Sequence, residues 1–196
     1  MTREIRAPNR RKVAIMRTAS VRINSRPAGS ELNYGYTYRR TSIMPNDSVK
    51  DILARAKQRG ATMNLPYAGA VLPSEAHALL QQLPGSRLVD VRTQAEWDYV
   101  GHVPESVLVE WNTYPSGQRN QEFLEQLQSK VPATEAPVMF LCRSGARSHH
   151  AAMVATQAGY PNSYNILEGF EGDKDTSGHR NTVGGWRVAG LPWVQG

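Results

Sequence analysis

The chain of 196 residues contains a single cysteine, Cys142. One cysteine excludes internal disulfides and cysteine-rich zinc sites. Long apolar runs are also lacking: none approaches the roughly 20 residues that a bilayer requires, and the N-terminus lacks the apolar core of a secretory signal. We therefore expect no membrane span, and a reducing, cytoplasmic location.

Acidic residues are scarce at the N-terminal end. The first 43 residues carry ten lysines and arginines but only two glutamates, a net charge of +8, whereas the rest carries 13 basic and 15 acidic residues. We expect residues 1–45 to form a disordered basic tail. Three interpretations of the tail stay open: an arm that contacts nucleic acid or anionic lipid, a transit peptide that directs the protein to mitochondria, or sequence that is not normally translated.

Helical and strand patterns alternate through the rest of the chain. Strands are predicted at 68–72, 87–92, 106–110, 138–141 and 164–167, and helices at 73–83, 93–101, 120–130 and 148–158. Strands separated by helices imply an α/β fold with a parallel sheet covered on both faces. An earlier helix, predicted to end near Gly60, has only Ile52 and Leu53 on its apolar face. Residues 46–65 are therefore predicted to be a satellite helix and linker, and 66–196 the domain.

Cys142 follows an apolar strand and begins a loop that contains arginine and glycine. The loop leads into an alanine-rich helix. Successive N–H groups of such a loop, with the positive end of a helix dipole, bind anions and favour a thiolate. The carboxyl ends of parallel strands, where α/β proteins place their sites, also hold Asp90. The alternative is an inert, buried cysteine, but the flanking arginines argue against it. We interpret Cys142 as a reactive nucleophile.

Six short segments resemble, in order and spacing, the single-domain rhodanese family of sulfurtransferases. They are 88–92 (LVDVR), 96–97 (EW), 101–104 (GHVP), 142–148 (CRSGARS), 167–170 (LEGF) and 190–192 (GLP). The resemblance covers about residues 66–194. It implies a rhodanese-like α/β domain with a central parallel five-stranded sheet, and a catalytic Cys142 that carries sulfur as a persulfide. No cofactor is expected.

The resemblance implies two half-reactions at Cys142. The thiolate takes the outer sulfur of thiosulfate or a similar small anion, and then passes it to cyanide, a thiol or a sulfur-accepting protein. Backbone N–H groups would stabilise the sulfur anion, and Arg143 would hold the donor's sulfonate. Ser144 either donates its hydroxyl to the persulfide or only shapes the turn. The predicted anion-binding set is Arg143, Ser144, Gly145, Ala146 and Arg147.

Two further residues are predicted to support the site. Asp90 is a candidate partner for Arg147, because a cation at a helix start opposes the dipole and calls for an anion. Arg92 either pairs with Glu96, four residues along, or reaches the pocket. Gly145 is required for a tight loop whichever chemistry holds.

Two other functions use parts of the same pattern. A cysteine-dependent phosphatase or arsenate reductase would also place a cysteine in such a loop, but phosphatase relatives have arginine at the sixth position after it. Here Arg147 is fifth and Ser148 is sixth, which favours a ring sized for sulfur. A non-catalytic rhodanese-like binding module would usually have lost the cysteine. The sequence therefore favours sulfur transfer over both.

The polar, glycine-rich segment 171–185 is predicted to be a surface loop that borders the pocket and governs which acceptor enters. Adjacent residues on a helix point about 100° apart, so His149 and His150 cannot chelate one metal together. No metal site is expected. The sequence does not specify the physiological donor, the acceptor or the oligomeric state.

Overall fold

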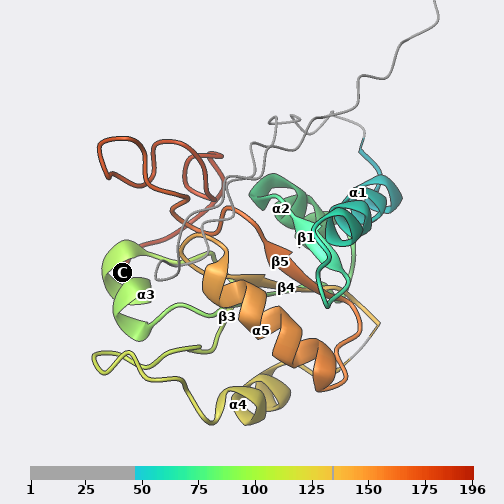
Figure 1. The fold of residues 1–196 in the computed structure, drawn as a ribbon, viewed down its shortest axis with the longest axis horizontal. Helices are drawn as coiled ribbons and strands as arrows, with labels where there is room; N and C mark the ends of the chain where they lie inside the picture. The colour runs from blue at the N-terminus through green and yellow to red at the C-terminus, as the bar shows by residue number, and fades with distance from the viewer. Residues whose placement is uncertain (1–46, 134) are drawn as a thin grey trace, which may run out of the picture. The chain divides into compact units, whose positions relative to one another are not determined.

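A computed structural model of the chain describes residues 47–133 and 135–196, so the predicted basic tail lies outside the described residues. None of the helices in this part of the chain is long and apolar enough to span a bilayer. The elements, shown in Figure 1, are α1 (Val49–Thr62), β1 (Gly69–Val71), α2 (Pro73–Gln82), β2 (Arg87–Asp90), α3 (Gln94–Val100), β3 (Val107–Leu108), α4 (Phe123–Lys130), β4 (Val138–Leu141), α5 (Ala146–Gln157) and β5 (Ser163–Ile166).

The five strands form one sheet in the order β1-β5-β4-β2-β3, and every neighbouring pair is parallel. The predicted parallel five-stranded sheet is therefore confirmed. β4 is the central strand, and all four of its residues are buried, as expected for a parallel strand covered on both faces. The chain leaves this strand at Cys142, so the cysteine lies at the middle of the sheet's carboxyl edge.

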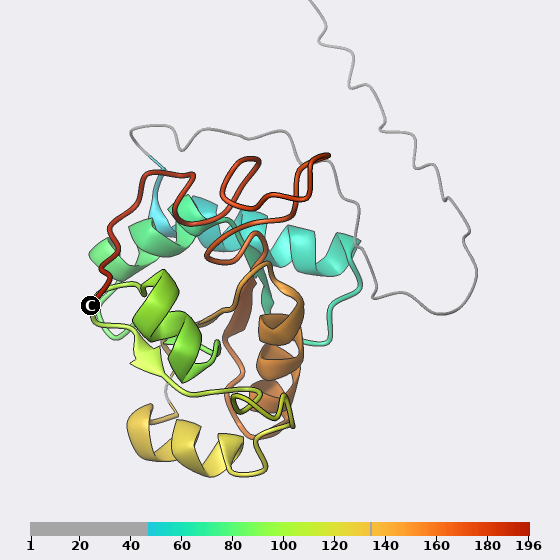
Figure 2. The same cartoon turned by 90° about the vertical axis from the view of Figure 1, so that its left-hand side faces the viewer.

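Helices cover both faces of the sheet (Figure 2), and each face has its own apolar cluster. On one face, Phe123 and Leu127 of α4 pack with the alanines of α5 against Val89 and Phe140. On the other, α1 and α2 cover side chains of β2, β4 and β5, with Leu79 among the fully buried residues. The alternation of inward side chains along the strands supplies both clusters.

α1 differs from the predicted satellite helix. It begins after Ser48, as expected, because the Ser48 hydroxyl and the Asp51 carboxylate cap each other's backbone N–H groups. However, Gly60 does not end the helix, which continues to Thr62. Ile52 and Ala56 are fully buried, and a Cβ on Gly60 would lie 2.8 Å from the Cα of Gly69. Small residues thus let α1 pack closely on β1, so that this helix belongs to the core.

Two other boundaries differ from the sequence prediction in ways that bear on the site. α5 begins at Ala146, two residues earlier than predicted, because Gly145 adopts a left-handed conformation and serves as its N-cap. β3 is limited to Val107–Leu108, although the N–H groups of Val109 and Trp111 continue to donate to β2 and the residue after it. The start of α5 therefore lies within the cysteine loop itself.

Candidate active site

The cysteine loop, residues 142–148, connects the end of β4 to the first turn of α5. Cys142 is 1 % exposed. Its Sγ accepts two hydrogen bonds, one from the N–H of Gly145 at 3.1 Å and one from the hydroxyl of Ser148 at 3.2 Å. The N–H groups of the first turn of a helix have no partner within the helix. The sulfur therefore accepts from two donors at the start of α5, an arrangement that favours a sulfur anion.

Gly145 shapes the loop. Its φ of +98° is accessible to glycine and rarely to other residues, and a Cβ at this position would lie 2.2 Å from the carbonyl oxygen of Leu167. Its own carbonyl oxygen accepts two hydrogen bonds at 3.1 Å, from the N–H of His149 and from Nδ2 of Asn165. The loop is held closed at this residue from both sides.

The chain that follows β5 clamps the other end of the loop. Gly169 (φ +62°) packs so closely that a Cβ would lie 2.5 Å from the carbonyl oxygen of Cys142. The next two N–H groups donate to the loop: Phe170 to the carbonyl of Cys142 at 2.8 Å and Glu171 to that of Arg143 at 2.9 Å. The segment 167–170, which carries part of the rhodanese resemblance, is thus the wall against which the loop is formed.

Arg147 lies in the first turn of α5 and forms a bidentate pair with Glu96 of α3, with both N–O distances 2.7 Å. Burial alone would raise the pKa of Glu96, yet the hydrogen bonds and charge of Arg147 outweigh it and lower the pKa to about 2. Arg143 is exposed. Of the two arginines in the loop, Arg143 is therefore the one that has no carboxylate contact within residues 47–133 and 135–196.

Asp90 and Arg92 form a second ion pair, in which both side chains are fully buried. Nε of Arg92 donates to Asp90 at 3.0 Å, Nη2 also donates to the carbonyl of Gly101 at 2.7 Å, and the guanidinium lies 4.0 Å from the ring centroid of Phe170. The two predicted pairings, Asp90 with Arg147 and Arg92 with Glu96, are wrong. Arg92 follows a strand rather than lying on a helix, so its side chain turns back to Asp90.

The polar segment 171–185 starts at the cysteine loop. Its first residue, Glu171, bonds to Arg143 as described, and the carbonyl of Glu171 accepts the N–H of Asn181 at 2.8 Å. Gly172 and Gly184 approach so closely that a Cβ on Gly172 would lie 2.2 Å from the carbonyl oxygen of Gly184. The segment is thus a closed surface loop whose base adjoins the residue next to Cys142.

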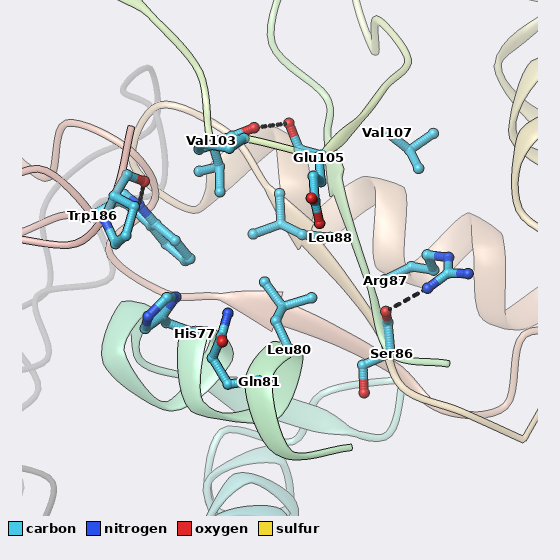
Figure 3. Close-up of a pocket in the computed structure, with 13 residues that line it drawn as sticks. His77, Leu80, Gln81, Ser86, Arg87, Leu88, Val103, Glu105, Val107 and Trp186 are labelled. Carbon is cyan, nitrogen blue, oxygen red and sulfur yellow. Dashed lines mark hydrogen bonds between the residues drawn. The ribbon is translucent and has the colours of Figure 1, made fainter. Parts of the chain in front are cut away.

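A cavity of about 550 Å³ lies elsewhere, between α2 and residues 103–107 (Figure 3). His77 and Leu80 of α2 face Val103 and Glu105 across it, and Leu88 forms its floor. None of residues 142–148 lines this cavity. The site predicted from the sequence is therefore a different place from this cavity.

Comparisons with known proteins show the family of the chain. The family model of the rhodanese-like domain matches residues 72–176. The chain belongs to the rhodanese-like family. It is 48 % identical to the crystal structure of Rv0390 from M. tuberculosis, with a TM-score of 0.61, over 66 % of this chain and 99 % of that one.

Two relatives in sequence cover much of the same region. RC0915 of Rickettsia conorii, an uncharacterized protein, is 38 % identical over 124 residues, which are 63 % of this chain and 94 % of the relative. Thiosulfate sulfurtransferase 18 of Arabidopsis thaliana is 38 % identical over 102 residues, which are 50 % of this chain and 71 % of the relative. Sulfurtransferases are thus among the relatives of this rhodanese-like chain.

The predicted residues of this rhodanese-like domain divide into those that surround the sulfur and those that do not. Gly145 contacts Sγ directly, whereas Ser144 is half-buried and Ala146 exposed in the same loop. Three further residues were not predicted as part of the site: Ser148, at the end of the loop, contacts Sγ, and Glu96 and Asn165 contact the loop from outside it. Ser148 could have been found from the helical pattern, because it lies in the first turn after the cysteine. The contact of Asn165 depends on the sheet register.

Proposed function

We propose that this rhodanese-like chain is a sulfurtransferase that carries sulfane sulfur on Cys142. The observation that carries the proposal is the convergence of the Gly145 N–H, the Ser148 hydroxyl and the start of α5 on one buried sulfur. Such donors stabilise negative charge on sulfur where water is largely excluded. The similarity to a plant thiosulfate sulfurtransferase supports the same conclusion.

In the first half-reaction, the Cys142 thiolate attacks the outer sulfur of thiosulfate or a similar donor. A bond forms between the two sulfurs, the sulfur–sulfur bond of the donor breaks, and sulfite leaves with its electron pair. The charge moves to the outer sulfur of the persulfide, towards the loop donors. Arg143, exposed beside the nucleophile, is suited to hold the sulfonate of the donor.

In the second half-reaction, a thiophilic acceptor attacks the outer sulfur. Cyanide leaves as thiocyanate and a thiolate leaves as a persulfide, and each returns Cys142 to its thiolate form. The chain holds no second cysteine, so the acceptor thiol must come from another molecule, either a small thiol or a sulfur-accepting protein. The loop 171–185, which begins against Arg143, is the segment best placed to select it.

The phosphatase alternative receives no support from these contacts. The position where that chemistry would need an arginine is occupied by Ser148, whose hydroxyl donates to Sγ. Arg147, one residue earlier, is engaged by Glu96. The loop thus offers no guanidinium at the sixth position to neutralise a phosphoryl group.

The intact mass of the purified protein before and after thiosulfate tests the proposal. We expect the mass to increase by one sulfur atom, the increase to be removed by cyanide with release of thiocyanate, and no increase in Cys142→Ser. Because serine is close in size to cysteine, the variant should keep its fold, which circular dichroism checks. A sulfur adduct on Cys142→Ser, or none on the wild type with thiosulfate and polysulfide alike, contradicts the proposal.

A further inference from the structure

Asn165 is a polar residue in an otherwise apolar environment. It lies in β5, is 4 % exposed, and pairs in register with Ala70 of β1 and Phe140 of β4, both of which are fully buried. Asparagine is unfavourable in strands, and a strand buried between two neighbours is normally apolar. Strand formation and packing therefore give no reason for an amide at this position.

Only one of the two polar atoms of the Asn165 side chain is satisfied. Nδ2 donates to the carbonyl oxygen of Gly145 at 3.1 Å, whereas Oδ1 is buried and has no hydrogen-bond partner among the described residues. An unpartnered buried oxygen destabilises the fold, and an apolar residue of similar shape would remove this cost. The bond to Gly145 is the contact that distinguishes Asn165 from such a residue.

That contact lies one peptide unit from the reacting sulfur. In a trans peptide the C=O and N–H point in opposite directions. Because Asn165 holds the carbonyl of Gly145, the N–H of Ala146 in the same peptide points the opposite way. The N–H on the other side of Gly145 donates to Sγ of Cys142 at 3.1 Å. The orientation of both donors depends on Gly145.

We propose that Asn165 is a positioning residue that orients the Gly145–Ala146 peptide so that the cysteine loop stabilises a sulfur anion. It touches neither sulfur donor nor acceptor. The assignment deepens the proposed function, on which it rests, because the sulfur anion is the form in which Cys142 would attack and carry sulfur. His149, whose N–H also donates to the carbonyl of Gly145, holds the peptide in the helix but not against the sheet.

Alkylation of Cys142 by iodoacetamide at neutral pH separates positioning from a merely structural role. Asn165→Leu keeps the branching and the number of heavy atoms of the side chain but removes the donor. Losing the hydrogen bond that holds the Gly145–Ala146 peptide should weaken the stabilisation of a sulfur anion and reduce the alkylation rate by about fivefold. A purely structural loss would loosen the loop, expose the buried sulfur and make alkylation faster. The two roles therefore predict changes of opposite sign.

Asn165→Asp is the second variant, and it carries the test if the leucine variant does not fold. It preserves shape and polarity but faces the Gly145 carbonyl with an acceptor, so alkylation should be slowed at least as much as in Asn165→Leu. The control is Ser163→Ala, on the same strand, where a buried hydroxyl donates to the carbonyl of Tyr160 at 2.9 Å. Its alkylation rate should equal that of the wild type.

Sulfur transfer measured beside alkylation keeps this proposal distinct from the proposed function. If wild-type protein transfers sulfur, kcat should fall in Asn165→Leu about as much as alkylation, with little change in KM. If wild-type protein transfers none, the proposed function fails, whereas slowed alkylation in both variants still supports the role of Asn165. Unchanged or faster alkylation in the folded variants overturns that role.

Discussion

Two regions of the domain bury a carboxylate against arginine, and they differ in what that burial does. Glu75 of α2, 2 % exposed, accepts hydrogen bonds from Arg55 and Arg59 of α1. Glu96 of α3, 19 % exposed, holds Arg147 in the first turn of α5. The first cluster joins two helices and contacts nothing in the cysteine loop. The second fixes a residue of the loop itself, so equivalent chemistry contributes to stability in one place and to the shape of the site in the other.

The largest effect on activity should come from a substitution that distorts the cysteine loop and leaves the Glu75 cluster unchanged. Gly145→Ala puts a methyl group 2.2 Å from the carbonyl of Leu167 at a φ of +98°. The loop must then shift by an ångström or more, and misplacement on this scale costs about 100-fold in rate. We expect kcat/KM for thiosulfate to fall by at least about 100-fold, measured by thiocyanate production.

Gly159→Ala is the matched control, because Gly159 has a nearly identical φ of +95° with nothing within 4 Å of the added Cβ. It should reduce the free energy of unfolding by about 1 kcal/mol and leave activity unchanged. Equal activity losses in the two variants would show that backbone strain, rather than the crowding of the cysteine loop, is responsible.

Glu75→Gln should give the opposite result, a large loss of stability with little loss of activity. Arg59 would keep its charge in a partly buried position that has lost its carboxylate, whereas Arg55 would keep its ion pair with Asp47. Breaking a buried pair from one side destabilises proteins by about 3 kcal/mol. We expect this decrease in the free energy of unfolding, measured with urea. The kcat should stay within about twofold of the wild-type value, a difference that corresponds to less than about 0.5 kcal/mol.

Glu96→Gln should affect both properties, with a dependence on pH that identifies the group. The pKa of Glu96 is lowered from its ordinary 4.5 to about 2 in the folded protein. A lowered pKa gives stability that is complete above pH 4.5 and is lost as the pH falls towards 2. The free energy of unfolding of the wild type should therefore exceed that of Glu96→Gln by on the order of 2 kcal/mol at pH 6.

That difference in unfolding free energy should shrink steadily below pH 4.5, as urea titrations of both proteins would show. A gap that stays constant down to pH 3 is incompatible with the ion pair as its source. Activity should fall modestly at neutral pH, because Arg147 becomes free to move in the mouth of the loop.

Ser148→Ala should have the smallest effect of the four substitutions when each effect is expressed as a free energy. The sulfur would lose the hydroxyl donor at 3.2 Å but keep the N–H of Gly145. One hydrogen bond corresponds to about a fivefold change in kcat, with stability nearly unchanged because alanine suits a helix. A kcat equal to that of the wild type would reduce Ser148 to a packing role and leave the backbone as the main source of stabilisation.

The sequence predicted the elements of the site better than the contacts between them. Local pattern was sufficient for β4, whose bounds are those predicted, and for Cys142 at its carboxyl end. The packing of α1 could not be found by counting apolar side chains, because the approach of Gly60 to Gly69 depends on their absence. Spacing likewise suggested the wrong partner for Arg92, and the contact of Asn165 depends on the register of β5.

The two amides that clamp the cysteine loop give it a spectroscopic reporter. The N–H groups of Phe170 and Glu171 are bonded to the carbonyls of Cys142 and Arg143, so their protons can exchange with deuterated water only when the loop separates from the chain after β5. Exchange at these two positions therefore measures how often the cysteine loop separates from the chain after β5. It does so without substrate, and the exchange rate can be compared before and after incubation with thiosulfate.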